Sequence, residues 1–243
     1  MINILIIIFS KNELESLIRT FEKIKELHES ECLGDLNCEI VIVDDGSSID
    51  IQIQLQNYFY SAKSSTNMTF KFKAQKQQGI ASLVSEVLSE TNKDFDLLLP
   101  LPGHDMFAKD SLRKLLCSSS KDEITIGFRE NLWNERPLLK FVAAKILTFS
   151  YSLIIKRKIK DAHGLYIFPF QLAKKVISSY DGHEILLLPL YRGIKSDVKI
   201  KEIPVLLSEG HFLQSKVKGR SSHPRLNHVF SSIKVLFKIL KEN

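Results

Sequence analysis

The sequence predicts an α/β protein whose central sheet is mostly parallel, Rossmann-like and flanked by helices. Two observations carry this prediction. Apolar runs of strand length alternate with segments of helical period through the first 130 residues, and nearly every run ends in a polar cluster. A chain of 243 residues with 44% hydrophobic content is also long enough for one sizeable core. We therefore expect the polar clusters to gather at the carboxyl edge of the sheet, where open α/β sheets bind ligands.

The first strand is expected over residues 4–8, an uninterrupted run of Ile and Leu. Ser10 and Glu13 follow it with the spacing of a capping box, which predicts a helix over residues 14–27. Leu14, Leu17 and Phe21 fall on one face of that helix, as a core-facing helix requires. A second apolar run over residues 40–43 then completes a strand–helix–strand unit.

The second run ends in Asp44, Asp45, Gly46 and Ser47, the most informative stretch of the chain. Adjacent carboxylates at a strand end repel each other unless a ligand binds them, and a nucleobase N–H, ribose hydroxyls or a metal ion would do so. An acidic turn without a ligand is the alternative, because Asp, Gly and Ser also favour turns.

The later elements continue the alternation. We expect strands over residues 69–72, 95–99 and 123–128, with helices over residues 79–89 and 109–116. Gln78 and Gly79 open the first of these helices, and a polar turn from Pro100 to Asp105 follows the strand over residues 95–99. Arg129 ends the strand over residues 123–128.

In this order of motifs the chain resembles the inverting glycosyltransferases of family 2, which have the GT-A nucleotide-sugar fold. The short polyprenyl-phosphate mannose synthase-like branch is the most similar. Three later segments match that branch: the acidic then Gly-aromatic residues 161–168, Glu-Ile-Pro-Val at 202–205, and a basic Gly-Arg-Ser-Ser loop at 219–222.

The resemblance implies transfer of a sugar, of hexosyl type, from a nucleotide-diphosphate sugar to a polyprenyl phosphate or a glycan precursor. It implies a donor site made of Ser10, Glu13, Asp44, Asp45, Gly46, Ser47, Gln78 and Gly79. It also implies catalytic roles for Asp105, Asp161, Arg129 and Arg220, with Lys216 as a further phosphate-neutralising cation. A lipid phosphate is already an anion, whereas a sugar hydroxyl would need a base, for which Asp161 and Glu184 are candidates.

One departure concerns the metal. Family members carry Asp-x-Asp after the fourth strand to hold a divalent ion, and Pro100-Leu101-Pro102 stands at the aligned positions. His104 and Asp105 follow and supply a nitrogen and an oxygen, which suits Mn²⁺ more than Mg²⁺, although a polar turn alone is the other interpretation.

This departure keeps a second function open, a catalytically impaired GT-A domain that binds a nucleotide-sugar or a partner without turnover. A nucleotidyltransferase is a third possibility. It lacks support because no Gly-rich loop with Arg and Lys follows Ile8.

Charge is concentrated in two segments. Residues 138–160 hold six Lys or Arg and no acid, and residues 211–241 hold seven and no acid, a total of +13 in a chain whose net charge is +6. Both segments are also apolar, and Val229, Ile233 and Leu236 lie on one face of an expected C-terminal amphipathic helix. We expect an anionic membrane surface as partner, or else ordinary core-facing helices, and no nucleic acid.

We therefore expect a glycosyltransferase domain over residues 1–210 and a basic C-terminal segment over residues 211–243, packed on the domain or on a membrane. Cys32, Cys38 and Cys117 have no metal or redox spacing, which suits a reducing cytosol. The apolar run over residues 4–8 is too short and lacks the basic leader of a signal peptide. The expected location is the cytoplasmic face of a membrane.

Overall fold

The computed structural model describes residues 1–30, 33–64, 69–75, 79–135, 138–177 and 187–208. Its strands form one seven-stranded sheet in the order β3-β2-β1-β4-β6-β5-β7. The strands are β1 (Ile2–Ser10), β2 (Leu36–Asp45), β3 (Thr69–Gln75), β4 (Leu97–Pro102), β5 (Glu123–Arg129), β6 (Leu165–Pro169) and β7 (Lys199–Val205). Every ladder is parallel except the two that β6 makes with β4 and β5. The predicted mostly parallel sheet is confirmed.

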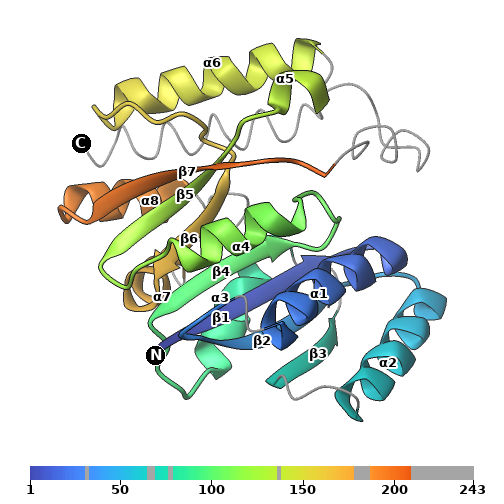
Figure 1. The fold of residues 1–243 in the computed structure, drawn as a ribbon. Coiled ribbons are helices and arrows are strands. Elements are labelled where there is room, and N and C mark those ends of the chain that lie inside the picture. The colour runs from blue at the N-terminus through green and yellow to red at the C-terminus, as the bar shows by residue number, and fades with distance from the viewer. Residues whose placement is uncertain (31–32, 65–68, 76–78, 136–137, 178–186, 209–243) are drawn as a thin grey trace.

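Helices cover both faces of the sheet (Figure 1). They are α1 (Leu14–Glu29), α2 (Ile49–Ser64), α3 (Ile80–Glu90), α4 (Lys109–Cys117), α5 (Leu132–Glu135), α6 (Leu138–Ile154), α7 (Phe170–Ile177) and α8 (Leu187–Lys195). Buried residues of α1, α2 and α4 belong to one core cluster, and those of α3, α7 and α8 belong to the cluster on the opposite face.

The apolar runs of the sequence form strands because both of their faces are buried. In β1, Ile4, Ile6 and Ile8 face one core cluster, whereas Leu5 and Ile7 face the other, and all five are at most 1% exposed. Period-two alternation sends successive side chains to opposite faces, so a strand between two helical layers needs apolar residues at every position.

Two local predictions are wrong. The capping box is absent, because Ser10 is the last residue of β1 and pairs with Asp44, while Glu13 occupies the N-cap of α1 without a side-chain cap hydrogen bond. The expected turn at Pro100-Leu101-Pro102 is also absent, because these residues are the second half of β4. The strand therefore ends at Pro102, and the polar loop begins at Gly103.

Two prolines fit inside this strand because of how β4 is paired. Gly103 donates its N–H to the Phe9 carbonyl of β1, so by alternation the nitrogens of Pro100 and Pro102 face the β6 side. There the ladder includes only Leu97 and Leu98 of β4. Because proline has no N–H, the two positions lose no hydrogen bond to a neighbouring strand. Any other residue there would place a buried N–H without an acceptor.

The predicted C-terminal amphipathic helix, with residues 211–243, lies outside the described residues, as do Gln78, Glu184, Lys216 and Arg220. Within the described ranges, no helix has both the length and the hydropathy needed to cross a bilayer.

Candidate active site

The first polar group lies at the carboxyl ends of β1, β2 and β3, where the sequence predicts the donor site. Asp44 ends up fully buried, not merely at a strand end, and its carboxylate has partners from its own chain. Oδ2 accepts the Ser47 N–H at 3.0 Å and Gln52 Nε2 at 3.1 Å, and Oδ1 accepts the Ser47 hydroxyl. In this structure the carboxylate of Asp44 therefore holds the turn that leads into α2.

Asp45 has a different position, because its side chain is only partly buried. Its Oδ1 accepts the backbone N–H of Gly79 at 3.2 Å, and Gly79 is the N-cap of α3. Gly79 has φ +89° and ψ 159°, a conformation that is essentially restricted to glycine. The second carboxylate thus lies at the amino end of a helix, where backbone N–H groups also favour phosphate.

The loops after β1 and β2 are joined by hydrogen bonds. The Asn12 N–H donates to Ser47 Oγ at 2.7 Å, and the Ser48 N–H donates to Asn12 Oδ1 at 3.0 Å. Asn12 has φ +54° and Gly46 has φ +76°, so both turns use the left-handed region. Asn12 and Gln52 hold this edge together. Sequence reasoning assigned neither a role, although Asn12 lies in the Ser-Lys-Asn-Glu stretch after the first strand.

Ser10 is the last residue of β1 and lies at this carboxyl edge. It is 7% exposed, and its Oγ has no hydrogen-bond partner among the described residues. Gly103 packs directly against it, since a Cβ at Gly103 would approach Ser10 Cβ to 3.0 Å and Leu17 Cδ1 to 2.8 Å. The β1 and β4 ends therefore meet closely, and a side chain at position 103 would close the space beside Ser10.

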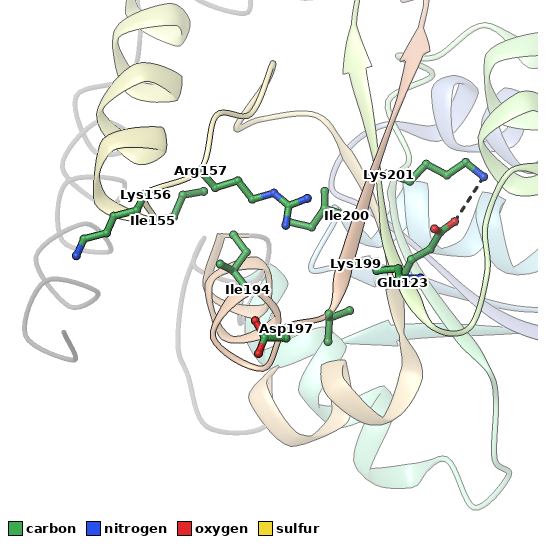
Figure 2. A pocket seen from close by; sticks show the side chains of 10 residues that line it. Glu123, Ile155, Lys156, Arg157, Ile194, Asp197, Lys199, Ile200 and Lys201 are labelled. Carbon is green, nitrogen blue, oxygen red and sulfur yellow. Dashed lines mark ion pairs between the residues drawn. The ribbon is translucent and has the colours of Figure 1, made fainter.

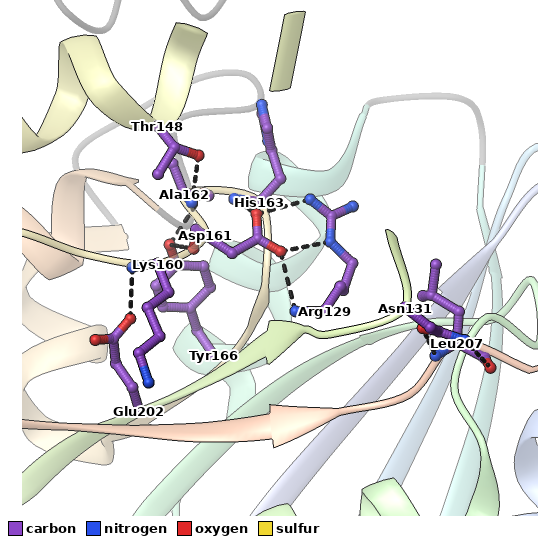
Figure 3. A network of polar contacts seen from close by, with 10 residues as sticks. All are labelled: Arg129, Asn131, Thr148, Lys160, Asp161, Ala162, His163, Tyr166, Glu202 and Leu207. Atoms are coloured by element: carbon purple, nitrogen blue, oxygen red, sulfur yellow. Dashed lines mark hydrogen bonds and ion pairs between the residues drawn. The ribbon is translucent and has the colours of Figure 1, made fainter. Parts of the chain in front are cut away.

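The second polar group is a buried ion pair between two residues predicted to be catalytic (Figure 3). Arg129, at the end of β5, donates from Nε to Asp161 Oδ2 at 2.6 Å and from Nη2 to Oδ1 at 2.8 Å. The backbone N–H groups of Arg129 and His163 also donate to this carboxylate, at 3.2 and 3.0 Å. Asp161 thus accepts four hydrogen bonds, and it pairs with Arg129 instead of the nearby lysines at 156–160.

Electrostatics argue against Asp161 as a general base. Burial raises the pKa of its carboxyl, but the Arg129 charge and the hydrogen bonds from Arg129 and His163 outweigh burial and lower that pKa to about 2. A base whose pKa is far below the working pH accepts a proton poorly. The geometry instead gives Asp161 the task of holding Arg129 in place at the end of β5.

The third group contains Asp105, the predicted metal ligand. Its Oδ2 accepts Arg19 Nε at 2.9 Å, its Oδ1 lies 2.6 Å from Lys23 Nζ, and its backbone N–H donates to Thr20 Oγ1 at 3.0 Å. The carboxylate is therefore held by two cations of α1. No group of three His, Cys, Asp or Glu side chains suited to a metal occurs among the described residues. Residues His104 and Asp105, as placed here, do not fit a divalent ion.

A cavity of about 560 Å³ lies elsewhere, at the amino-terminal ends of β5 and β7 (Figure 2). Glu123, Lys199 and Lys201 line one side, and Lys156 and Arg157 line another. Because β5 and β7 run parallel to β1, this cavity is at the sheet edge opposite to the three polar groups. It is therefore not the predicted donor site.

The fold and the polar carboxyl edge are those of the open α/β proteins that bind ligands at this edge. Comparison with known proteins identifies the family. The profile of glycosyl transferase family 2 matches residues 5–167. The chain therefore belongs to glycosyl transferase family 2. No curated protein sequence matches the chain.

Solved structures confirm the GT-A fold. The mannosyltransferase PcManGT of Pyrobaculum calidifontis, in complex with GDP-Man and Mn²⁺, has a TM-score of 0.54 at 11% identity and covers 85% of this chain and 56% of its own. Mannosyl-3-phosphoglycerate synthase of Rubrobacter xylanophilus has a TM-score of 0.56 at 11% identity, over 90% of this chain and 76% of its own. GalNAc-T7 with UDP, GalNAc and Mn²⁺ has a TM-score of 0.54 at 17% identity, over 86% of this chain and 44% of its own. The chain thus spans about half the length of two of these three proteins.

Proposed function

We propose that the protein transfers a hexosyl group, with inversion, from a nucleoside-diphosphate sugar to a phosphate carried by a lipid. The observation that carries the proposal is the juxtaposition of Asp45 with the amino end of α3 at the β1–β2–β3 edge. A carboxylate there can accept hydrogen bonds from a base or a ribose. The N–H groups of the first turn of α3 can receive a phosphate.

Inverting transfer needs a nucleophile, an aligned donor and a stabilised leaving group. An oxygen of the acceptor attacks the anomeric carbon, the bond from that carbon to the diphosphate breaks, and the nucleoside diphosphate leaves with the electron pair. The α3 amino end would stabilise the charge that develops on the leaving diphosphate. The buried Arg129–Asp161 pair would hold the end of β5 and the segment before β6 in place at the same edge.

The chemistry of Asp161 favours an anionic acceptor. This carboxyl is buried in its pair with Arg129, and its pKa is about 2. It is therefore a poor base for a sugar hydroxyl. A phosphate acceptor is an anion at neutral pH and needs no base, so positioning and charge stabilisation suffice. A glycan acceptor stays the alternative for the same donor site, and it would require a base from another residue.

The test combines binding and transfer. A panel of UDP-, GDP- and CDP-sugars, with and without Mn²⁺, should contain at least one ligand that raises the melting temperature. Asp45→Asn should weaken its binding by about 1–3 kcal/mol, the range for a hydrogen bond to a charged group. Asp110→Asn is the matched control, since that acid is 89% exposed on α4.

Transfer of the best sugar to polyprenyl phosphate then tests the acceptor. Binding without hydrolysis or transfer, in the presence or absence of metal, would support the catalytically impaired domain instead. Transfer only to a soluble glycan would keep the donor site and reject the lipid. A lipid acceptor also implies that the protein works at the cytoplasmic surface of a membrane, as the basic segments of the sequence suggest.

A further inference from the structure

Helix α6 has an outer face that no described residue covers. Tyr151, Ala144, Thr148 and Ile155, which follows its last turn, are buried against the body of the protein. On the opposite side, at a spacing of three and four residues, large apolar side chains are 43–68% exposed: Leu138, Leu139, Val142, Ile146, Phe149 and Leu153. At 3.6 residues per turn they fall within an arc of about 100°. A surface helix normally directs charged and polar groups to that side.

The exposed face continues onto α5. Trp133 is 61% exposed, and its ring meets the Phe141 ring edge-on at a centroid distance of 4.9 Å. Lys145 Nζ lies over the same Phe141 ring, 5.6 Å from its centroid. We call Trp133 and the six apolar residues of α6 the α5–α6 face. Seven large apolar side chains on one surface exceed the scattered exposure that is ordinary for a soluble protein.

The charges along α6 and just beyond its end are all positive, whereas Glu130 and Glu135 lie near Trp133 in the sequence. Lys145 lies on the flank of the α5–α6 face, and Lys156, Arg157 and Lys158 are exposed just beyond the end of α6. No Asp or Glu occurs anywhere from residue 138 to residue 160. A second copy of the chain would add another set of these cations to the same interface, and residues 138–160 supply no acid to neutralise them. An anionic surface would instead neutralise all of them.

We propose that the α5–α6 face docks on an anionic phospholipid surface, with α6 lying in the interface plane. Its apolar side chains enter the acyl boundary, Trp133 sits at headgroup level, and the flanking cations contact lipid phosphates. The helix is about 25 Å long, which suits lying on a bilayer and is short of spanning one.

This surface also lies near the predicted chemistry. Helix α5 begins three residues after Arg129, and Asn131 fixes that connection through two hydrogen bonds with the backbone of Leu207 (Figure 3). The Trp133 end of the face therefore adjoins the carboxyl end of β5. The inference deepens the proposed function, on which it rests, because a lipid-borne phosphate at that end would reach the edge where Arg129 lies.

The chain offers a direct probe, because Trp133 is its single tryptophan. With vesicles of phosphatidylcholine and 30% phosphatidylglycerol at low salt, Trp133 emission should shift to the blue, and brominated lipids should quench it. Acrylamide should quench Trp133 readily in buffer alone. Protection from acrylamide in buffer would overturn the proposal, because the chain itself or a second copy would then cover the face. Light scattering would identify a dimer.

Variants separate this docking from other effects. Ile146→Ser with Phe149→Ser and Leu153→Ser should weaken partition into those vesicles by roughly a hundredfold, since each loses apolar burial. The matched control is Ile53→Ser with Tyr60→Ser, two exposed apolar residues of α2, and it should bind vesicles like the wild type. Lys145→Glu with Lys156→Glu should weaken binding to anionic vesicles but change little on pure phosphatidylcholine.

Two further outcomes would contradict the inference: wild-type protein that fails to bind anionic vesicles, or a triple Ser variant that binds as well as the wild type. Nucleotide-sugar affinity, measured in solution on the same proteins, keeps the two proposals apart. Retained donor binding with no vesicle binding would reject the α5–α6 face alone. Vesicle binding without any donor binding would reject the proposed function alone.

Discussion

Arg129 and Asp161 lie 32 residues apart in the chain and form a two-pronged ion pair that is almost completely shielded from solvent. The pair joins the end of β5 to the segment that enters β6. Gly164 permits this approach, because a Cβ there would collide with the Gly127 carbonyl of β5. The ion pair thus depends on a close backbone contact nearby.

The pair makes stability depend on acid. Asp161 has an ordinary pKa of 3.8, which folding lowers to about 2. A lowered carboxyl pKa contributes stability that is complete above the ordinary value and is lost as pH falls through the folded one, here from about pH 4 to pH 2. The contribution is about 2 kcal/mol. Urea unfolding at pH 6, 4 and 3 should show this loss, and Asp161→Asn should flatten that part of the profile.

Removing one charge of the Arg129–Asp161 pair should lower the free energy of unfolding more than removing both charges. Asp161→Asn leaves Arg129 buried without its counter-ion and should destabilise the protein by about 3–5 kcal/mol. Arg129→Met combined with Asp161→Asn should cost clearly less than the sum of the single changes. Asp110→Asn, which removes an exposed acid 3.9 Å from Arg113, should have a small effect. Strict additivity in denaturant unfolding would show that the two side chains are not coupled.

The two acids after β2 should behave differently. Asp44→Asn should reduce the free energy of unfolding by about 1–3 kcal/mol, because the amide nitrogen replaces one acceptor oxygen and cannot accept the bond or bonds that Ser47 or Gln52 donate there. Asp45→Asn should leave stability nearly unchanged and weaken nucleotide-sugar binding. Thermal unfolding and calorimetry on both variants would separate the effects. The reverse assignment would place the ligand contact on Asp44.

Donor binding should not depend on a divalent ion. Asp105 is held by Arg19 and Lys23, so Mn²⁺ would have to displace two cations to reach its carboxylate. We expect the nucleotide-sugar affinity to be the same in Mn²⁺ and in chelator. A gain of about tenfold or more with Mn²⁺, 1.4 kcal/mol, would contradict this expectation. The gain should then vanish in His104→Ala with Asp105→Ala if those residues are the ligands.

Much of the fold follows from the sequence because buried parallel strands carry a strong signal. The runs over residues 4–8 and 40–43 are unmistakable, and both lie inside strands. Helix α2 was missed for a physical reason. Ile49, Ile51, Ile53 and Leu55 alternate as in a strand, yet the helix buries Leu55, Phe59 and Ala62, which are spaced by four and three. Tertiary packing overrode the local pattern.

The candidate site was only partly predictable. Asp44, Asp45 and Gly79 share one edge because parallel strands end together, and the sequence shows where those strands end. Arg19 and Lys23 could not be predicted as partners of Asp105, since they belong to an ordinary amphipathic helix. The Arg129–Asp161 pair depends on the antiparallel insertion of β6, which no local motif indicates.

The prolines of β4 have a consequence for how the two halves of the sheet are joined. Strand β4 pairs with β1 over six positions but with β6 over only two, Leu97 and Leu98. Beyond Leu98, Pro100 and Pro102 supply no N–H to a ladder with β6. Side-chain packing must therefore hold the β1–β2–β3 end of the sheet, with the donor site, in alignment with the end of β5, where Arg129 lies. The two halves of the sheet share a core but are joined through the backbone by only a short ladder. Their spacing is therefore set by the shapes of buried residues such as Leu99 and Leu101. Substitutions at those positions, far from any polar group, would adjust the distance between donor and acceptor.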